Sequence, residues 1–398
     1  MQGGQERATG EKMVLNFGPQ HPATHGTLRI VLELDGESVL KAIPHAGYLH
    51  TGFEKLGEHL DYNQYIVVTD RMNYLSPLSN NFGYVLAVEQ LLGIEVTKRC
   101  QYIRILMAEL SRLADHLLWL GTAALDLGAF SVFLYSFRER EKLYSIFEKT
   151  TGARLTTSYT RVGGVLRDLY DGCEEDVQQF VTNFPKALKE THTLLTKNRI
   201  WMDRTKGVGA ISADDAISYG LTGPCLRATG IAHDIRKAEP YSSYDEVTFE
   251  VPVGTNGDAY DRYLVRMEEM IQCCGIVTQV LDNMPDGSVN LEDNKVTMPN
   301  KSDAYGHIEG LIHHFKIVMD GHGVQPPMGE HYCATESPNG ELGFYIVSDG
   351  SGTAYRIRIR PPSFLHFQAL PHMLEGGMVS DTVAVLGSLN VIAGELDR

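Results

Sequence analysis

Hydrophobic residues alternate with polar ones in short segments near both ends of the chain. In residues 27–34 every second position is apolar, which is typical of a strand with one buried face, and an Asp-Gly pair then leads into a returning segment over residues 38–43. Residues 342–348 and 354–360 flank an Asp-Gly-Ser-Gly turn. The alternation therefore predicts one β-hairpin near each end of the chain.

Between these hairpins the apolar positions recur every three or four residues, which is the spacing of one helix face. The clearest stripe consists of Ile103, Leu106, Leu110, Leu113, Leu117 and Leu120. Similar patterns predict further helices over residues 76–92, 131–149, 174–196, 257–283 and 302–320. We therefore expect an α+β protein that is mainly α, a helical bundle with β elements near both chain ends.

The pattern divides the chain into four regions, with no internal repeat and no low-complexity linker. Residues 1–13 are polar and glycine-rich, so we expect a disordered tail and no secretory signal. Residues 14–55 form the expected N-terminal β region with a histidine loop, and residues 56–325 the helical core. Residues 326–398 are expected to form a C-terminal β-hairpin and a tail, with a short helix in residues 381–398.

One apolar segment raises the question of a membrane. Residues 116–137 are 22 residues long and carry one formal charge, that of Asp126. The length suits a bilayer span, but an unpaired charge in its middle costs at least about 2.5 kcal/mol. Charged amphipathic helix also continues on both sides. We therefore favour a buried helix in a bundle over a membrane span.

Composition and charge exclude several classes of function. The 398 residues include 50 acidic and 35 basic ones, for a formal net charge of −15. This balance argues against a nucleic-acid-binding protein, which needs a basic surface, and against unaided docking on anionic lipid. The six cysteines are scattered without a C-x-x-C pair, so we expect reduced structural thiols in a cytosolic protein. Glycine-rich nucleotide loops and the common hydrolase motifs are missing.

The first candidate for chemistry is the loop Gly-Pro-Gln-His-Pro-Ala-Thr-His-Gly at residues 18–26. His21 and His25 are four residues apart, but Pro19 and Pro22 oppose a helix that would place both on one face for a metal ion. Two interpretations remain. The loop is a rigid turn with two exposed imidazoles, or it is preorganised to present one histidine as a proton donor near neutral pH.

Three further residues have both an ordinary and a functional interpretation. Arg71 is compatible with a surface charge, and Tyr74 with an amphipathic core aromatic. Asp126 lies inside an apolar run, where a carboxylate needs a partner or becomes protonated. That makes Asp126 a functional candidate, although a helix-capping or ion-pair role explains it equally well.

Together, several short segments resemble the family of the D subunit of NADH-quinone oxidoreductase, respiratory complex I, from about residue 13 to the end of the chain. These segments are residues 18–26, 47–55, 109–113, 125–129, 137–141, 207–211, 221–223, 336–337, 340–349 and 397–398. The family is similar to the large subunit of NiFe hydrogenases, which hold their metal with two C-x-x-C pairs. Here the corresponding segments read Arg-Met-Asn-Tyr at residues 71–74 and Leu-Asn-Val-Ile at residues 389–392. Without those four thiolates we expect no metal and no other cofactor bound by this chain.

The resemblance implies a cavity for a quinone headgroup next to the terminal [4Fe–4S] cluster of a partner subunit. Tyr74 and His25 match the residues at the two quinone carbonyls, and Asp126 matches the carboxylate that partners this histidine. His21 belongs to the cavity loop. Arg71 matches an arginine near the partner's cluster, where a fixed cation raises the reduction potential.

Two positions depart from the family pattern. Thr156 stands where the family usually has a histidine beside the cluster, and Asn390 stands where an aspartate is usual. The first departure affects the expected pH dependence of the cluster. The second removes a possible proton carrier from the cavity wall.

The expected function is that of a peripheral-arm subunit of the proton-pumping complex, inactive alone, on the cytoplasmic side of the bacterial inner membrane. Its expected partners are the Fe–S subunit, other peripheral-arm subunits and a membrane-arm subunit at the quinone entrance, with ubiquinone or menaquinone as substrate. The alternatives are a related complex that uses F420 or ferredoxin as electron donor, and a purely structural scaffold. An active NiFe hydrogenase is excluded by the missing cysteines.

Overall fold

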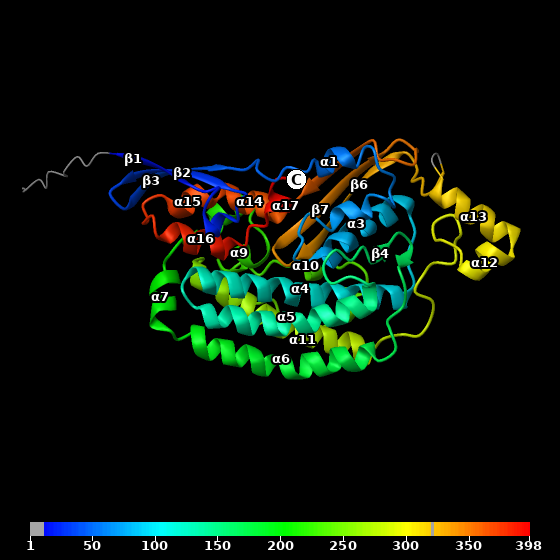
Figure 1. Ribbon diagram of the computed structural model, residues 1–398, viewed down its shortest axis with the longest axis horizontal. Coiled ribbons are helices and arrows are strands. Elements are labelled where there is room, and N and C mark those ends of the chain that lie inside the picture. Colours follow the sequence, from blue (N-terminus) through cyan, green and yellow to red (C-terminus); the bar gives the residue numbers. More distant parts are fainter. Residues whose placement is uncertain (1–11, 320–321) are drawn as a thin grey trace, which may run out of the picture.

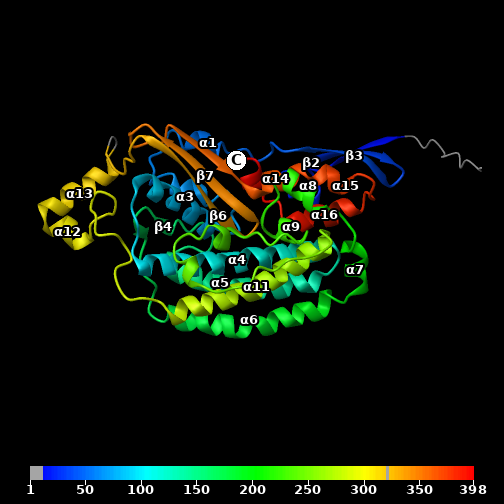
Figure 2. The same ribbon diagram turned by 180° about the vertical axis from the view of Figure 1, so that it is seen from behind.

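The computed structural model describes residues 12–319 and 322–398, and the protein is mainly α with small β elements, as the sequence predicts. The expected disordered tail lies outside the described residues except for Lys12 and Met13. Figures 1 and 2 show two layers. Long helices run along one side of the molecule, and two sheets with short helices run along the other.

The helical layer contains the four longest helices. They are α4 (Lys98–Asp126), α5 (Phe130–Thr151), α6 (Cys173–Leu195) and α11 (Ala259–Asp282). Helix α4 packs against both α5 and α11, and every residue of its predicted stripe is buried. Thr97 begins this helix, because its hydroxyl accepts a hydrogen bond from the backbone N–H of Cys100. The predicted helices of this layer are confirmed.

The apolar run over residues 116–137 is not one helix. It comprises the end of α4 and the start of α5, separated by a turn in which Gly128 adopts a φ of +90°. Leu117, Trp119 and Leu120 are buried, as a bundle helix requires, whereas Phe130 is 58% exposed. Across the described part of the chain, none of the helices has the length and apolar character to cross a membrane.

The N-terminal sheet has the antiparallel order β1-β2-β3. Its strands are β1 (Met13–Phe17), β2 (Arg29–Asp35) and β3 (Ser38–His45). The predicted hairpin is confirmed, and the apolar positions Leu28, Ile30, Leu32 and Leu34 are all buried. Four short helices follow at the end of the chain: α14 (Pro362–Gln368), α15 (Leu370–Leu374), α16 (Asp381–Leu389) and α17 (Ala393–Leu396). Helix α15 packs on β3 and α16, whereas α14 packs on α17.

The C-terminal sheet has three strands rather than the two of a hairpin. These are β6 (Gly329–Ser337), β7 (Gly340–Ser348) and β8 (Arg356–Arg360), and the sheet packs on α3 (Pro77–Leu92). The predicted pair β7–β8 is confirmed, but β6 was not predicted. The short helix expected within residues 381–398 is confirmed as α16, but the tail expected after it is wrong, because α17 follows and Leu396 is only 1% exposed.

The helix expected over residues 302–320 is broken in two. Its parts are α12 (Lys301–Gly306) and α13 (Ile308–Val318), and the break falls at His307, whose backbone is extended. Short elements complete the described chain: η1 (Pro22–Thr24), α1 (Phe53–Leu56), α2 (Ile66–Thr69), β4 (Thr160–Arg161), β5 (Gly164–Val165), α7 (Arg199–Thr205), α8 (Ala213–Ser218), α9 (Gly223–Arg227), α10 (Ile235–Ala238) and η2 (Tyr244–Glu246).

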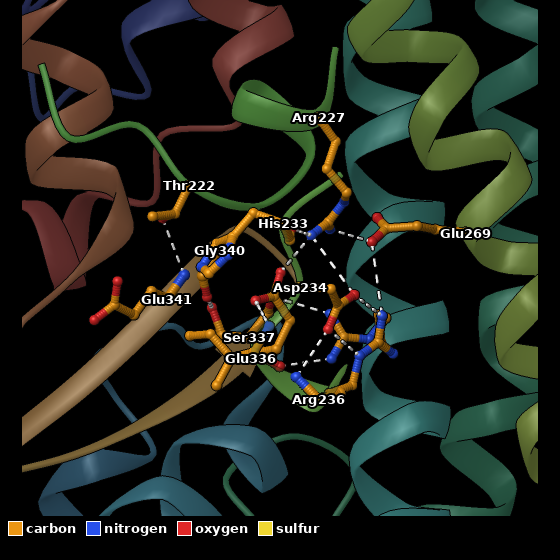
Figure 3. A network of polar contacts seen from close by, with 12 residues as sticks. Thr222, Arg227, His233, Asp234, Arg236, Glu269, Glu336, Ser337, Gly340 and Glu341 are labelled. Atoms are coloured by element: carbon orange, nitrogen blue, oxygen red, sulfur yellow. Dashed lines mark hydrogen bonds and ion pairs between the residues drawn. The ribbon is translucent and has the colours of Figure 1, made fainter. Parts of the chain in front are cut away.

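A buried network of charges joins the two layers (Figure 3). Arg227 of α9 pairs with Glu269 of α11 and, at 2.8 Å, with Glu336 of β6. Arg236 of α10 pairs with Asp234 at 2.6 Å and with Glu109 of α4 at 3.0 Å. Each of these side chains is at most 2% exposed. Because buried charges are stable only when paired, the network holds the sheet and the helical layer in one relative position.

Candidate functional site

The histidine loop is a tight turn between β1 and β2. The imidazole Nδ1 of His21 accepts a hydrogen bond from the backbone N–H of Ala23 at 3.1 Å, and its ring lies 4.1 Å from that of Phe17. A Cβ on Gly18, whose φ is +83°, would come within 2.3 Å of the Leu28 carbonyl oxygen, so only glycine fits there. His21 thus stabilises the loop, and the expectation that no helix carries both histidines is confirmed.

His25 ends this turn in the left-handed conformation, with a φ of 53°, and is exposed. It lines a cavity of about 250 Å³ together with Tyr74 and Asp126. These three come from the loop after β1, from the segment before α3 and from the last residue of α4. The rest of the wall is mostly apolar and consists of Ala23, Leu28, Leu75, Leu118, Trp119, Thr122, Ala123, Leu386, Gly387, Asn390, Val391 and Ile392.

A larger hollow of about 600 Å³ lies elsewhere, between α2, the β4–β5 hairpin and the α12–α13 region. None of the predicted site residues lines it. We place the candidate site in the smaller cavity, because a few polar groups converging on an apolar wall are typical of a small-molecule site.

Tyr74 is half-buried at this cavity. Burial raises the pKa of its phenol, and the neighbouring carboxyls of Asp115 and Glu395 raise it further. The phenol is therefore protonated near neutral pH, and its hydroxyl can donate a hydrogen bond to a carbonyl oxygen of a ligand.

Asp126 is also half-buried. Burial raises the pKa of its carboxyl, and the two imidazoles of His25 and His21 act in the opposite direction. His25 and Asp126 do not hydrogen-bond each other in this structure, so their expected partnership is limited to a shared cavity and an electrostatic interaction.

Behind the cavity lies a buried polar cluster, of which the sequence pointed only to Asn390. The carboxylate of Asp115 accepts hydrogen bonds from the amides of Asn73, at 3.1 Å, and Asn390, at 2.9 Å. The amide of Asn390 also donates to the side-chain oxygen of Asn339 at 2.5 Å. Asp115 lies on helix α4 and is fully buried. The sequence gave no sign that it accepts these hydrogen bonds, because its partners come from distant segments.

This cluster is where the two segments that resemble the hydrogenase metal ligands meet. Asn73 belongs to residues 71–74 and Asn390 to residues 389–392. Two residues beyond the second segment, a Cβ on Gly394 would lie 2.5 Å from the carbonyl oxygens of both Arg71 and Met72, so the chain there packs directly on the first segment. Amides and a carboxylate thus occupy this junction. Within residues 12–319 and 322–398, no three histidine, cysteine or acidic side chains gather as metal ligands would.

Arg71 and Thr156 are both exposed, and neither lines the cavity. Their segments nevertheless lie side by side, because the buried carboxylate of Asp70 accepts hydrogen bonds from the hydroxyl and, at 3.1 Å, the backbone N–H of Ser158. Arg71 and Thr156 therefore lie on neighbouring surface segments. The segment of Arg71 continues to Tyr74, which lines the cavity.

The helical bundle and the sheets form the mainly α architecture expected from the sequence, and neither residues 71–74 nor residues 389–392 contain a cysteine. Residues 126–398 match the family described as "Respiratory-chain NADH dehydrogenase, 49 Kd subunit". The chain belongs to this family, which includes the D subunits of NADH-quinone oxidoreductase.

Individual relatives match over nearly the whole chain. The D subunit of NADH-quinone oxidoreductase from Geobacter sulfurreducens is 54% identical over 391 residues, which cover 98% of this chain and all of that protein. The D subunit from Methylacidiphilum infernorum is 51% identical over 98% of this chain and 93% of its own length. In Bdellovibrio bacteriovorus the similar protein is a combined C/D subunit, 50% identical over 96% of this chain but only 68% of its own length.

Proposed function

We propose that this protein is the peripheral-arm subunit of a proton-pumping NADH-quinone oxidoreductase that forms the cavity for the quinone headgroup. One observation carries the proposal: His25, Tyr74 and Asp126 come from three distant parts of the sequence and line the same cavity. The alternative of a purely structural scaffold does not explain why these three side chains line one cavity. The relatives are named as subunits of NADH-quinone oxidoreductase, which favours NADH as the electron source over F420 or ferredoxin.

Reduction of a quinone to a quinol consumes two electrons and two protons. In the proposed site the Tyr74 hydroxyl donates a hydrogen bond to one carbonyl oxygen and the His25 imidazole to the other, which orients the ring. Each group then supplies a proton as charge develops on its oxygen. Loss of the imidazole proton exposes the charge of Asp126, a change that can start a conformational response elsewhere in the complex.

The electrons come from outside this chain. In the proposed assembly the terminal [4Fe–4S] cluster of the Fe–S partner subunit lies against the surface that carries Arg71 and Thr156. The guanidinium of Arg71 is exposed and its Nη1 donates to the Val67 carbonyl at 2.6 Å, so it is held at this surface as a fixed positive charge. NADH oxidation, flavin and the remaining clusters belong to other subunits.

The proposed assembly includes other peripheral-arm subunits and a membrane-arm subunit at the quinone entrance. The C/D protein of Bdellovibrio bacteriovorus supports a close neighbourhood with a C subunit, because fused chains are usually neighbours in an assembly. We place the subunit at the cytoplasmic side of the bacterial inner membrane as a peripheral protein, with ubiquinone or menaquinone as substrate.

The test is Tyr74→Phe in the assembled complex. The ring stays and the hydroxyl is lost, which leaves one quinone carbonyl without its donor. An unsatisfied partner costs about 1–3 kcal/mol, so kcat/KM for quinone should fall roughly 5- to 150-fold. Electron transfer from NADH to an artificial acceptor at the flavin subunit should be unchanged.

Tyr305→Phe is the matched control, because Tyr305 is 88% exposed on α12 and far from the cavity wall. It should leave both activities intact. If Tyr74→Phe lowered both activities together, the defect would be one of assembly. If it lowered neither, the quinone site would lie elsewhere and the scaffold alternative would stand.

A further inference from the structure

A buried cation lies behind the cavity and has no part in the function proposed above. Arg266 of α11 is fully buried. Among the described residues, its guanidinium donates to the carbonyl oxygens of Arg262, Ser388 and Leu389 and to the sulfur of Cys225, and it forms no ion pair with a carboxylate. Burying a cation without an ion pair costs free energy, so these contacts must contribute enough to offset that cost.

The guanidinium of Arg266 holds the C-terminal end of α16. Its Nη1 donates to the Ser388 carbonyl at 2.8 Å and its Nη2 to the Leu389 carbonyl at 3.5 Å. The last carbonyls of a helix have no partner within it, and a positive charge is favourable there because of the helix dipole. Residues 390–392, which follow directly, line the cavity. Arg266 therefore fixes the point at which this part of the wall leaves the helix.

The same guanidinium contacts a second part of the wall. Its central carbon lies 4.3 Å from the centre of the Trp119 ring, within the range of a cation–π contact. Trp119 of α4 lines the cavity, and its indole Nε1 donates to the Gly387 carbonyl of α16 at 2.7 Å. Arg266 therefore touches both the indole and the end of the helix to which that indole is bonded.

Arg262, one turn earlier on α11, has the same burial and charge but different contacts. Its Nε donates to the Ser388 hydroxyl at 2.9 Å, and its Nη1 and Nη2 donate to the carbonyls of Gly257 and Gly209, each at 2.9 Å. Within the described chain, none of these contacts involves Trp119 or a residue that lines the cavity. The contact with the indole thus distinguishes Arg266 from its neighbour.

We propose that Arg266 is a positioning residue that fixes Trp119 relative to the wall segment after α16 and thereby selects the quinone ring that the cavity accepts, an inference that rests on the function proposed above. Ubiquinone has one ring and menaquinone has two fused rings, so the two differ in the shape that they present to an apolar wall. A wall that is held in place discriminates between these shapes, whereas a wall that can shift adapts to both.

The chemistry of the guanidinium explains why an arginine suits this position. Its plane stacks on the indole, while the N–H groups at its edge donate to the carbonyls of Ser388 and Leu389. A lysine ammonium is a compact charge on a flexible stem, without a plane to stack or a fixed fork of donors. Arg266→Lys therefore keeps the charge and removes the simultaneous hold on both parts of the wall.

The experiment is Arg266→Lys in the assembled complex, with a short-chain ubiquinone and a short-chain menaquinone that carry the same prenyl tail. A misfit against an apolar pocket changes kcat/KM by roughly 10- to 200-fold, so the wild type should favour one of the two quinones. In the variant the ratio of the two kcat/KM values should fall about tenfold toward one, mainly through KM, because the groups that contact the carbonyls remain. Electron transfer from NADH to an artificial acceptor should be unchanged.

Arg262→Lys is the matched control, because it changes a buried arginine of the same helix that also reaches α16. It should leave the ratio of the two quinones at the wild-type value. An equal fall in both variants would mean that any loosening of this region has the same effect, which contradicts the proposal. An unchanged ratio in Arg266→Lys, or a wild type that does not discriminate, would overturn it as well.

Trp119→Phe is the second variant. Phenylalanine keeps an aromatic ring for the guanidinium but loses the N–H that donates to the Gly387 carbonyl, so the ratio should fall here too. Because both residues act through the same wall, the fall in the double variant should be smaller than the product of the two single effects. A full product would mean that the residues act independently. If Arg266→Lys prevents assembly, Trp119→Phe decides, and an unchanged ratio rejects the proposal.

Tyr74→Phe separates failure of this inference from failure of the proposed function. If Tyr74→Phe lowers kcat/KM for quinone while Arg266→Lys leaves the ratio unchanged, the cavity is the quinone site and only the positioning role of Arg266 is wrong. If Tyr74→Phe reduces both quinones normally, the quinone binds elsewhere, and the positioning role fails together with the proposed function.

Discussion

At the residue scale, Asn390 shows how one departure from the family pattern fits its surroundings. Its amide nitrogen donates to both Asp115 and Asn339. An aspartate in this position has no N–H to offer, so it would face the Asp115 carboxylate with a second negative charge or would carry a proton. With asparagine in place, an amide N–H satisfies the buried Asp115 side chain, and no second acidic group faces it from residue 390.

Thr156 is the second departure and leads to a prediction about the partner's cluster. A histidine beside a cluster binds a proton more tightly when the cluster gains an electron, so the reduction potential falls as pH rises. Threonine does not titrate in this range. In the proposed assembly the terminal cluster should therefore have a nearly pH-independent midpoint potential between about pH 6 and 8, where histidine usually titrates. Thr156→His should introduce a slope, up to about 59 mV per pH unit for one electron and one proton.

Redox titration followed by EPR at several pH values measures this slope on the whole complex. Thr156→Asn is the matched control, because asparagine is polar and does not titrate, and it should remain flat. Because Thr156 carries no positive charge where the family usually has a histidine, the midpoint potential of the cluster in the wild type should also be low. A low potential suits a low-potential quinone such as menaquinone. A steep slope in the wild type would show that another group titrates at the cluster.

At the element scale, the buried charges between β6, α9, α10, α11 and α4 hold the two layers together (Figure 3). Arg227→Met keeps a long side chain but leaves Glu269 and Glu336 without their main partner. Removing one member of a buried charge network costs about 3–5 kcal/mol, because the remaining charges are not compensated. We expect the unfolding free energy of the purified chain to fall by that amount in a urea titration.

Arg199→Met provides the comparison within the same protein. Arg199 pairs with Asp203 at 3.5 Å, but the two side chains are 91% and 68% exposed. Exposed pairs contribute at most about 1 kcal/mol, so this variant should unfold near the wild-type midpoint. Equal effects of the two substitutions would mean that the buried network adds little to stability.

At the scale of the whole molecule, the distribution of ligands predicts the metal content. All six cysteines are buried, and none of them forms a disulfide. In the part of the chain that the structure describes they form no metal-binding group with other side chains. Elemental analysis of the purified chain should therefore find no stoichiometric nickel, iron or zinc, because a tight site needs several ligands around one ion. About one firmly held ion per chain would contradict this prediction.

Local periodicity was sufficient to predict the elements that have one continuous apolar face in their own sequence. The stripe of α4, the long helices and the two hairpins were predicted because each has one apolar face that any core would bury. Strand β6 was missed because its sequence, Gly-Glu-His-Tyr-Cys-Ala-Thr-Glu-Ser, shows no apolar alternation, and three of its buried residues, Thr335, Glu336 and Ser337, are polar. The Glu336 carboxylate is buried only because Arg227 from a distant helix reaches it. A pairing between residues so far apart in the chain leaves no local pattern.

The sequence by itself determined the class of elements, the absence of a C-x-x-C pair and, through the family resemblance, the choice of His25, Tyr74 and Asp126. Tertiary structure alone decided that these three line one cavity, that His21 stabilises the loop, and that Asp115 and Asn390 meet behind the cavity. The physical reason is that a side chain's burial and charge partners depend on segments hundreds of residues away. Periodicity reports which face of an element is apolar, and it carries no information about which other element that face will meet.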